Sequence, residues 1–204
     1  MKKFILTGMV LLSFCITSCT KDLSIGGNSD TTESSDSTSE SPSNQQISGG
    51  YFVYSYENYA WGHQREGWII DKSGIVKAYL NPDRYNLPDS NGYITQEKIN
   101  ENLSICNISI GHISQELLSY YNNISFAIKS DIFSDRISHG GDVGSIKYYY
   151  YAFESISGKY KAKLLCEDGD WATYNKDNNA IKVTNWLKSI QSSPFPPPYH
   201  TCGN

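Results

Sequence analysis

The sequence lacks the features on which several large classes of protein depend. Its formal net charge is −4, and from Tyr51 onward it has 14 Lys and Arg against 16 Asp and Glu. Nucleic acid demands clustered positive charge, so it is not an expected partner. The chain has no P-loop, no dinucleotide fingerprint, no His-Glu-x-x-His, no Gly-x-Ser-x-Gly and no paired Cys-x-x-Cys. Several common enzyme classes therefore lose support, and no cofactor is predicted.

Long hydrophobic runs are also missing after the first few residues. Phe4 to Ile16 is an apolar run broken by only a few small or polar residues, and Lys2 and Lys3 give it a positive start. It is shorter than the ~20 residues that a membrane-spanning helix needs, and polar residues follow it at once. The pattern therefore predicts a signal peptide over residues 1–18.

The signal ends in the segment Ile16-Thr17-Ser18-Cys19. A branched apolar residue, two small residues and a cysteine in this order resemble the lipobox of bacterial lipoproteins. The resemblance implies cleavage before Cys19, lipidation of that cysteine, and attachment to a membrane through the N-terminal lipid. The alternative is an ordinary secretory signal in which Cys15 and Cys19 are incidental.

The residues after Cys19 bear on which membrane holds the protein. In the lipoproteins that this segment resembles, an Asp directly after the cysteine usually retains the protein in the inner membrane, and here that position is Thr20. The resemblance therefore implies an outer-membrane location, facing the periplasm or the cell surface. Lys21-Asp22 is similar to part of the short acidic signals that carry some Bacteroidota lipoproteins to the outside face, and it does not decide between the two faces.

A polar linker follows the lipidation site. From Asn28 to Gln46 there is no aliphatic, aromatic or cysteine residue. Such a segment has too little apolar surface to offset its chain entropy. Residues 19–50 are therefore predicted to be a disordered linker, and residues 51–204 a single globular domain.

Local patterns in this domain predict strands, then helices, then strands and a last helix. Alternating aromatic residues predict a strand from Tyr51 to Tyr59, and Asp71-Lys72-Ser73-Gly74 predicts the turn of a hairpin. Thr95 and Ser114 are predicted to cap two helices, the second of which Asn122-Asn123 would end early. Further strands are predicted at Ser145–Glu154, Lys159–Cys166 and Trp171–Tyr174, and a helix around residues 183–190.

The order of these elements predicts an α+β fold. Runs of strands separated from runs of helices are typical of an antiparallel sheet of hairpins with two or three helices packed on one face. In the last long strand, Tyr160 and Cys166 alternate with Lys159, Lys161 and Lys163. This pattern predicts one buried face and one wet face.

Three cysteines remain in the domain, namely Cys106, Cys166 and Cys202. Outside the cytoplasm one pair could form a disulfide, and the sequence does not say which. Cys166 is predicted to be a small buried hydrophobic residue. Pairs such as Cys106 with His112 are weak candidates for a cysteine hydrolase, because no oxyanion hole is visible from spacing.

The densest group of candidate site residues lies between Tyr59 and Trp68. His63 and Glu66 are candidates for an acid/base pair, and Trp61 and Trp68, with His63 and Arg65, for a binding surface for a sugar or peptide. The alternative interpretation is a connection whose tryptophans fill the core.

Three other segments have weaker functional interpretations. The glycine-rich segment His139 to Gly144 could present backbone amides to an anion, or be an ordinary loop. The acidic residues at 167, 168 and 170 lack the order of a calcium loop, so no metal site is predicted. In Tyr148–Tyr151 two tyrosines are predicted to be buried and two exposed.

These observations favour a membrane-anchored, non-catalytic binding module for a protein, peptide or glycan. The first alternative is a small extracytoplasmic hydrolase that uses His63 and Glu66. The second is a protease inhibitor or envelope scaffold, which would lack a pocket for a small molecule.

Overall fold

The computed structural model describes residues 49–60 and 62–190. Within these ranges the chain forms nine strands and three helices. The helices are α1 (Gln96–Ile105), α2 (Gln115–Phe126) and α3 (Asn178–Ser189). The strands are β1 (Tyr51–Asn58), β2 (Gln64–Ile70), β3 (Ile75–Leu80), β4 (Tyr93–Ile94), β5 (Ile108–His112), β6 (Ile137–Ser138), β7 (Ser145–Glu154), β8 (Lys159–Gly169) and β9 (Trp171–Tyr174).

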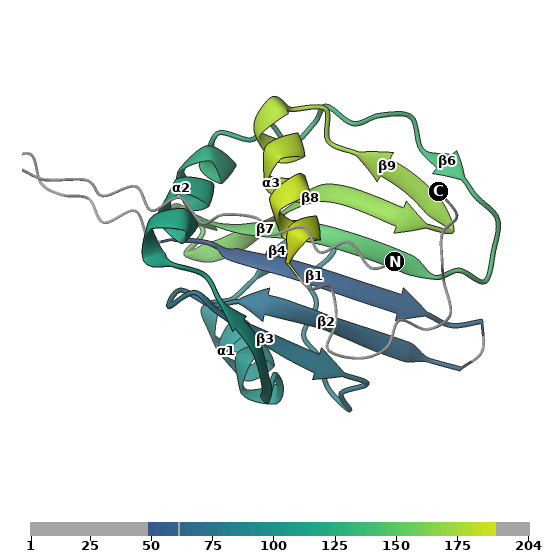
Figure 1. Ribbon diagram of the computed structural model, residues 1–204, viewed down its shortest axis with the longest axis horizontal. Helices are drawn as coiled ribbons and strands as arrows, with labels where there is room; N and C mark the ends of the chain where they lie inside the picture. Colours follow the sequence, from purple (N-terminus) through teal and green to yellow (C-terminus); the bar gives the residue numbers. More distant parts are fainter. Residues whose placement is uncertain (1–48, 61, 191–204) are drawn as a thin grey trace, which may run out of the picture. The chain divides into compact units, whose positions relative to one another are not determined.

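All the strands belong to one antiparallel sheet, in the order β5-β3-β2-β1-β7-β8-β9-β6, with β4 paired to β8. The predicted α+β fold is therefore confirmed. Helices α2 and α3 lie side by side on one face of the sheet, and α1 lies on the other (Figure 1). The predicted signal peptide and most of the linker fall in residues 1–48, which lie outside the described residues, so the domain boundary stays a prediction.

The turn between β2 and β3 is stabilised by hydrogen bonds between residues close in the sequence, as its residues predicted. Asp71 Oδ1 accepts hydrogen bonds from the backbone N–H groups of Ser73 (2.9 Å) and Ile75 (3.0 Å). Gly74 has φ +87°, and a Cβ there would come within 2.2 Å of the carbonyl oxygen of Ile113. The turn thus needs glycine for both its backbone conformation and its space.

The predicted helix caps are also confirmed. Thr95 Oγ1 accepts from the N–H of Lys98, and Ser114 Oγ accepts from the N–H of Leu117. Asp177 caps α3 through the N–H of Asn179. Each side chain satisfies one backbone donor that the first helical turn leaves without a partner.

The sequence suggested that Asn122 would end α2 early, and this prediction is wrong. Asn122 instead anchors the helix to the sheet. Its side chain is buried, and Oδ1 accepts hydrogen bonds from the N–H of Gly50 (3.0 Å) and the hydroxyl of Tyr150 (3.2 Å). The helix continues to Phe126. The asparagine is tolerated in the helix interior because its amide has partners just before β1 and in β7.

The centre of the sheet is buried on both faces, so the prediction of one wet face is wrong there. One core lies under α2 and α3 and contains Phe52, Trp68, Tyr150 and Leu187 among others. A second lies under α1 and contains Tyr51, Val53, Ile69, Tyr79, Ile99, Tyr151 and Tyr160. Three of the four residues in Tyr148–Tyr151 are buried and Tyr149 is half-buried, because strand parity sends them to two cores rather than to a core and to solvent.

A β-bulge explains why the alternation in β8 was misleading. Tyr148 pairs with Cys166 and Tyr149 pairs with Leu164, so Leu165 is an extra residue in β8. Leu165 and Cys166 both enter the core under α2 and α3, while Tyr160 enters the core under α1. Tyr160 and Cys166 therefore lie on opposite faces of the sheet.

Lys163 is not a solvated lysine but helps to close the end of α2. Its Nζ donates to the carbonyl oxygens of Phe126 and Ile128, each at 3.1 Å. Partial burial lowers the pKa of this ammonium group. A cation is favourable there because the carbonyls at the end of a helix have no partners within it.

Candidate functional site

The two tryptophans predicted as a binding surface do not form one in the described structure. Trp68 is 0% exposed and stacks on Tyr54, with ring centroids 5.6 Å apart. It is therefore a core residue, as the alternative interpretation held. Trp61 lies outside the described residues.

His63 and Glu66, the predicted acid/base pair, are not brought together. Glu66 is 6% exposed and lies opposite Tyr56, so it is on the face of the sheet that α2 and α3 cover. The His63 imidazole instead lies 3.4 Å from a carboxylate oxygen of Glu57, which is on the α1 face. No catalytic step that needs contact between His63 and Glu66 is supported.

Glu57 is the centre of a polar cluster at the end of β1. Its Oε1 accepts hydrogen bonds from the Tyr59 hydroxyl (2.7 Å) and from Arg65 Nε (3.0 Å). Partial burial opposes ionisation of Glu57, but the bonds from Tyr59 and Arg65 hold the pKa of this carboxyl below its usual value. Tyr59 also stacks on His63, with centroids 4.8 Å apart and planes 14° apart. Arg65 therefore acts here by holding Glu57 in place.

The backbone amides of the glycine-rich segment before β7 bind a carboxylate of the protein itself, that of Asp170. Asp170 Oδ1 accepts hydrogen bonds from the N–H groups of Val143 (2.8 Å) and Gly144 (3.2 Å). Asn58 donates to the carbonyl oxygen of Asp142 and so ties this segment to β1. Because Asp170 occupies these amides, the segment is a fixed wall rather than an open anion site.

A second polar cluster is centred on Glu167 in β8, three strands away from Arg65 in β2. Glu167 is 8% exposed, and its Oε1 is 3.3 Å from Arg136 Nη2, 3.6 Å from Lys147 Nζ and 3.2 Å from Ser145 Oγ. The Arg136 guanidinium also lies over the Trp171 ring, 4.6 Å from its centroid. Sequence reasoning missed this group, because its members meet only through the register of β7 and β8 and the path of the chain before β6.

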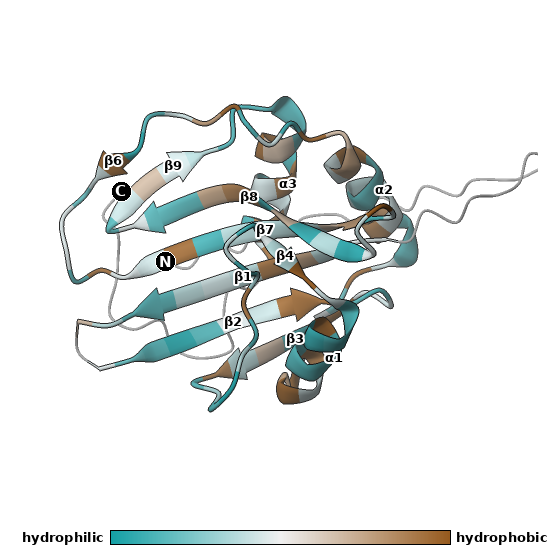
Figure 2. Cartoon of the chain, turned by 180° about the vertical axis from the view of Figure 1, so that it is seen from behind, coloured by the Kyte–Doolittle hydropathy of each residue, from teal (hydrophilic) through white to brown (hydrophobic). Residues whose placement is uncertain are grey.

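These two clusters line a concave surface of about 570 Å³, which we call the strand-end groove. It is on the α1 face, at the end of the sheet that α1 leaves uncovered. Figure 2 shows this face, with hydrophilic colours at the ends of β1, β2 and β8. Its lining includes Glu57, Tyr59, Arg136, Asp142, Lys147, Glu167, Asp170 and Trp171.

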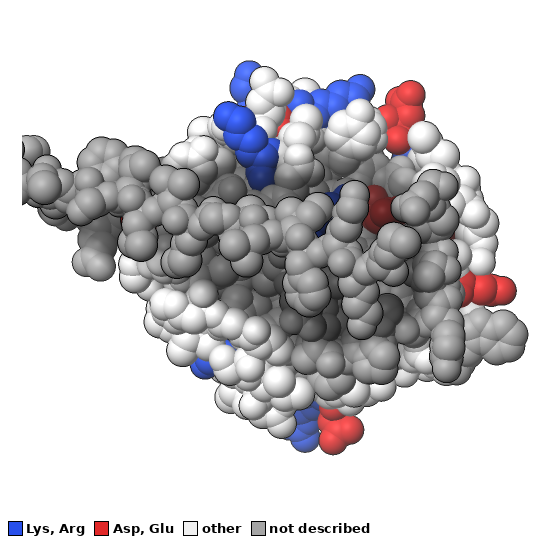
Figure 3. Space-filling view, viewed as in Figure 1, with Lys and Arg blue, Asp and Glu red and all other residues white. Residues whose placement is uncertain are grey.

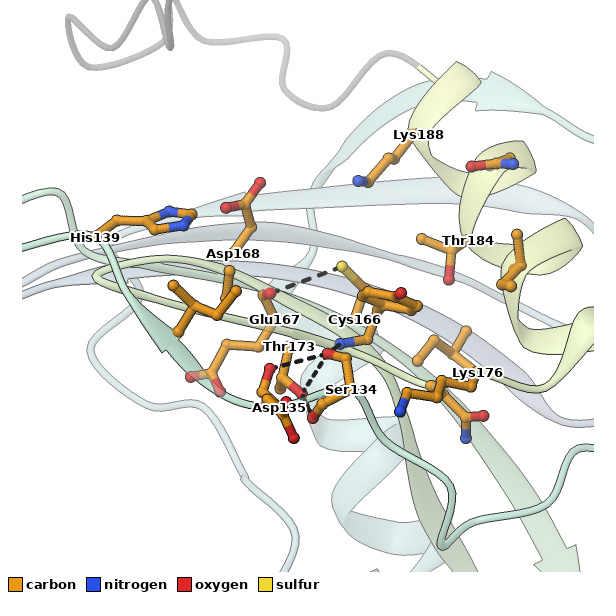
Figure 4. A pocket seen from close by; sticks show the side chains of 17 residues that line it. Ser134, Asp135, His139, Cys166, Glu167, Asp168, Thr173, Lys176, Thr184 and Lys188 are labelled. Carbon is orange, nitrogen blue, oxygen red and sulfur yellow. Dashed lines mark hydrogen bonds between the residues drawn. The ribbon is translucent and has the colours of Figure 1, made fainter.

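A larger concave surface of about 670 Å³ lies on the opposite face, between α3 and the strands β8, β9 and β6. We call it the helix cleft. Leu165, Cys166, Ala172 and Ile181 give it an apolar lining. Figure 4 shows Lys176 and Lys188 on the side of α3, and Asp135, His139 and Asp168 on the side toward β6. The cleft thus has an apolar floor between a basic wall, formed by Lys176 and Lys188, and an acidic wall, formed by Asp135 and Asp168.

Charged side chains of both signs are also visible at the edge of this face near the cleft. In Figure 3 the basic side chains of this view gather mainly at the edge where α3 lies, and acidic side chains lie beyond them toward β9 and β6. Lys188 and Asp168 both lie near enough to Cys166 to affect its thiol electrostatically. Charges of opposite sign therefore face the same space.

The residues of the helix cleft are suited to binding a ligand, and its cysteine is not suited to act as a nucleophile. Burial raises the pKa of the Cys166 thiol, so the thiolate that cysteine catalysis needs is disfavoured. Its Sγ contacts the carbonyl oxygen of Glu167 at 3.8 Å. Thr184, also in the lining, is buried, and its hydroxyl has no hydrogen-bond partner among the described residues.

Cys106 and Cys166 are expected to resist alkylation while the protein is folded. Both are free and buried, they lie in different cores, and burial raises the pKa of Cys106 to about 12. Iodoacetamide labelling at mildly alkaline pH, resolved by peptide mass spectrometry, should modify both only after denaturant is added. Rapid labelling of Cys166 in the native protein would contradict its assignment to the core. Cys202 lies outside the described residues.

Two further features of the residues that the structure describes bear on the kind of site they can form. Among these residues no group of three or more His, Cys, Asp and Glu side chains is arranged to hold a metal ion. No helix formed by them combines the length and the apolar character needed to cross a membrane.

The fold and the two concave surfaces define an α+β domain built on a large antiparallel sheet, with one polar and one amphipathic site. No known protein family matches the chain, and comparisons with curated proteins and with solved structures give no match either. The geometry of the two surfaces is therefore the basis for a proposed function.

Proposed function

We propose that this protein is a lipid-anchored, non-catalytic binding module of the bacterial cell envelope that captures short peptides in the helix cleft. The observation that carries the proposal is the apolar floor between a basic and an acidic wall. A short peptide has a carboxylate at one end, an ammonium group at the other, and apolar side chains between them. Its charge distribution matches that of the cleft.

The orientation of the peptide follows from the placement of the charges. Its carboxylate would lie near Lys188 and Lys176, and its amino group near Asp168 and Asp135. An apolar side chain would rest on Leu165 and Ile181. The Thr184 hydroxyl, which has no hydrogen-bond partner among the described residues, lies in the same lining and can bond to the peptide backbone.

The tether that the lipobox-like segment implies supports a binding role at a surface. A lipid on Cys19 would hold the domain at a membrane, which we propose is the outer membrane, with residues 19–50 as the linker. Cys19 and nearly all of this linker lie outside the described residues. A module held in this way meets its ligand in the periplasm or at the cell surface.

Neither alternative from the sequence is proposed. The hydrolase needed His63 beside Glu66, and these residues lie on opposite faces of the sheet. An inhibitor or scaffold was expected to lack a pocket for a small ligand, whereas the described residues form two concave surfaces. A peptide-binding module agrees better with both observations.

Lys188→Gln is expected to weaken the binding of short peptides that have a free C-terminal carboxylate by about tenfold. The same substitution should leave the binding of C-terminally amidated peptides nearly unchanged, because the lost partner is the carboxylate. Isothermal titration calorimetry with a panel of short apolar peptides, each free and amidated, measures the difference. Asp168→Asn should show the corresponding effect with free and N-acetylated peptides.

Lys182→Gln is the matched control for Lys188→Gln. Lys182 is exposed on the same helix and is not part of the cleft lining, so its loss should not alter affinity. If no peptide of the panel binds, or if both lysine variants bind free and amidated peptides equally, the proposed function is wrong.

A further inference from the structure

The strand-end groove has exposed aromatic rings at two points of a polar surface. Tyr59 is 67% exposed at the end of β1, and Trp171 is 42% exposed at the start of β9. In the sheet order β7 and β8 lie between these strands, so three steps of about 4.8 Å place the two backbones roughly 14 Å apart. A ligand that lies across the groove can contact both rings.

Each ring is held in orientation by a planar side chain that lies against one of its faces. His63 stacks on Tyr59, and Arg136 lies over Trp171. The hydroxyl of Tyr59 is also fixed by its hydrogen bond to Glu57. The rings therefore lose little conformational freedom when a ligand stacks on them, which favours binding.

The floor and walls between the rings are fixed by hydrogen bonds within the protein. Asp170 holds the amides of Val143 and Gly144, and Asn58 holds the carbonyl oxygen of Asp142. Gly144 has φ +84°, and a Cβ there would come within 2.7 Å of the carbonyl oxygen of Glu57. This close approach of the segment before β7 to β1 makes the wall a preorganised part of the site.

The charges of the groove favour a neutral ligand. Its lining has two basic residues, Arg136 and Lys147, and four acidic residues, Glu57, Asp142, Glu167 and Asp170. Glu57 is paired with Arg65, Glu167 with both basic residues, and Asp170 with two amides. An added anion would meet more acidic than basic groups, whereas a ligand with many hydroxyl groups can donate to the carboxylates and accept from Arg136 and Lys147.

We propose that the strand-end groove binds a neutral oligosaccharide, with sugar rings stacked on Tyr59 and Trp171. Sugar rings present apolar C–H faces and a rim of hydroxyl groups, which is the complement of aromatic rings on a polar floor. This site differs from the helix cleft, because it lies on the other face of the sheet and shares only Glu167 with the lining of the cleft. The inference does not depend on the peptide-binding function.

The test uses the purified full chain and a panel of short neutral oligosaccharides built from glucose, mannose, galactose, xylose or N-acetylglucosamine. Binding is measured by calorimetry and by tryptophan fluorescence. At least one oligosaccharide is expected to bind, Trp171→Ala and Tyr59→Ala should each weaken it by about tenfold, and Trp171→Phe should weaken it less, because the stacking face remains.

Tyr174→Ala provides the matched control. Tyr174 is exposed on the same strand as Trp171 but lines the helix cleft, so its loss should leave oligosaccharide binding unchanged. Urea unfolding of each variant shows that it is folded. Three results would overturn the inference: no member of the panel binds, only uronic-acid oligosaccharides added as a comparison bind, or binding is equal in wild type, Tyr59→Ala and Trp171→Ala. Peptide binding should survive Trp171→Ala, which separates this test from that of the helix cleft.

Discussion

Trp68→Ala is expected to lower the free energy of unfolding by about 3–5 kcal/mol, the usual cost of removing a large aromatic side chain from a core. Trp68 is 0% exposed, stacks on Tyr54, and lies on β2 near the middle of the sheet. Because a whole domain is typically stable by only about 5–15 kcal/mol, the loss should be a large fraction of the total. Urea unfolding followed by circular dichroism should show a much lower midpoint with a similar slope.

Two other substitutions make the measurement specific. Trp171→Ala removes the same side chain from a site that is 42% exposed, and should change stability by about 0.5 kcal/mol or less. Trp68→Phe should cost less than Trp68→Ala, because it leaves a smaller cavity and removes an indole N–H that has no hydrogen-bond partner among the described residues. Equal losses for Trp68→Ala and Trp171→Ala would contradict the assignment of Trp68 to the core.

Elements with local causes were predictable from the sequence. The Asp71 side chain bonds to groups two and four residues ahead, and the caps Thr95 and Ser114 bond to groups three residues ahead. The partners in these bonds can be read from the sequence without any knowledge of the fold. The α+β class followed because these elements come in runs of one type.

Features that depend on distant partners were not predictable. The β8 bulge arises from its pairing with β7 and from the need to fill two cores, and nothing in the alternation of β8 itself reveals it. The role of Asn122 in its helix depends on Gly50 and Tyr150, which are distant from it in the sequence. A single face was predicted to be buried because the sequence does not show that α1 crosses to the other side of the sheet.

The same difference between local and distant partners decides which parts of the candidate sites were predictable. The segment from Tyr59 to Trp68 was recognised as unusual, and Tyr59, His63 and Arg65 do meet, but on Glu57 rather than on Glu66. Strand parity separates His63 from Glu66 once the register of β1 and β2 is known. Arg136, Lys147 and Glu167 come from three separate segments and carry no motif.

Cys19→Ala, combined with replacement of residues 1–18 by an ordinary secretory signal peptide, is expected to move the protein from the membrane fraction to the soluble fraction of the cell envelope. Each methylene of an acyl chain buried in the bilayer contributes about 0.8 kcal/mol, so several chains on one cysteine give lasting attachment. Without the thiol no chain can be added at this position. Cell fractionation followed by immunoblotting measures the change, and mass spectrometry of the wild-type protein should find an acylated cysteine at the mature N-terminus.

Cys15→Ala is the matched control, because Cys15 lies within the predicted signal peptide and would be removed with it. That variant should stay in the membrane fraction. If Cys19→Ala fractionates with membranes as the wild type does, or if the native N-terminus is an unmodified residue after Cys19, the lipid tether is wrong. The helix cleft and the strand-end groove would still be testable, since their geometry depends only on the folded domain.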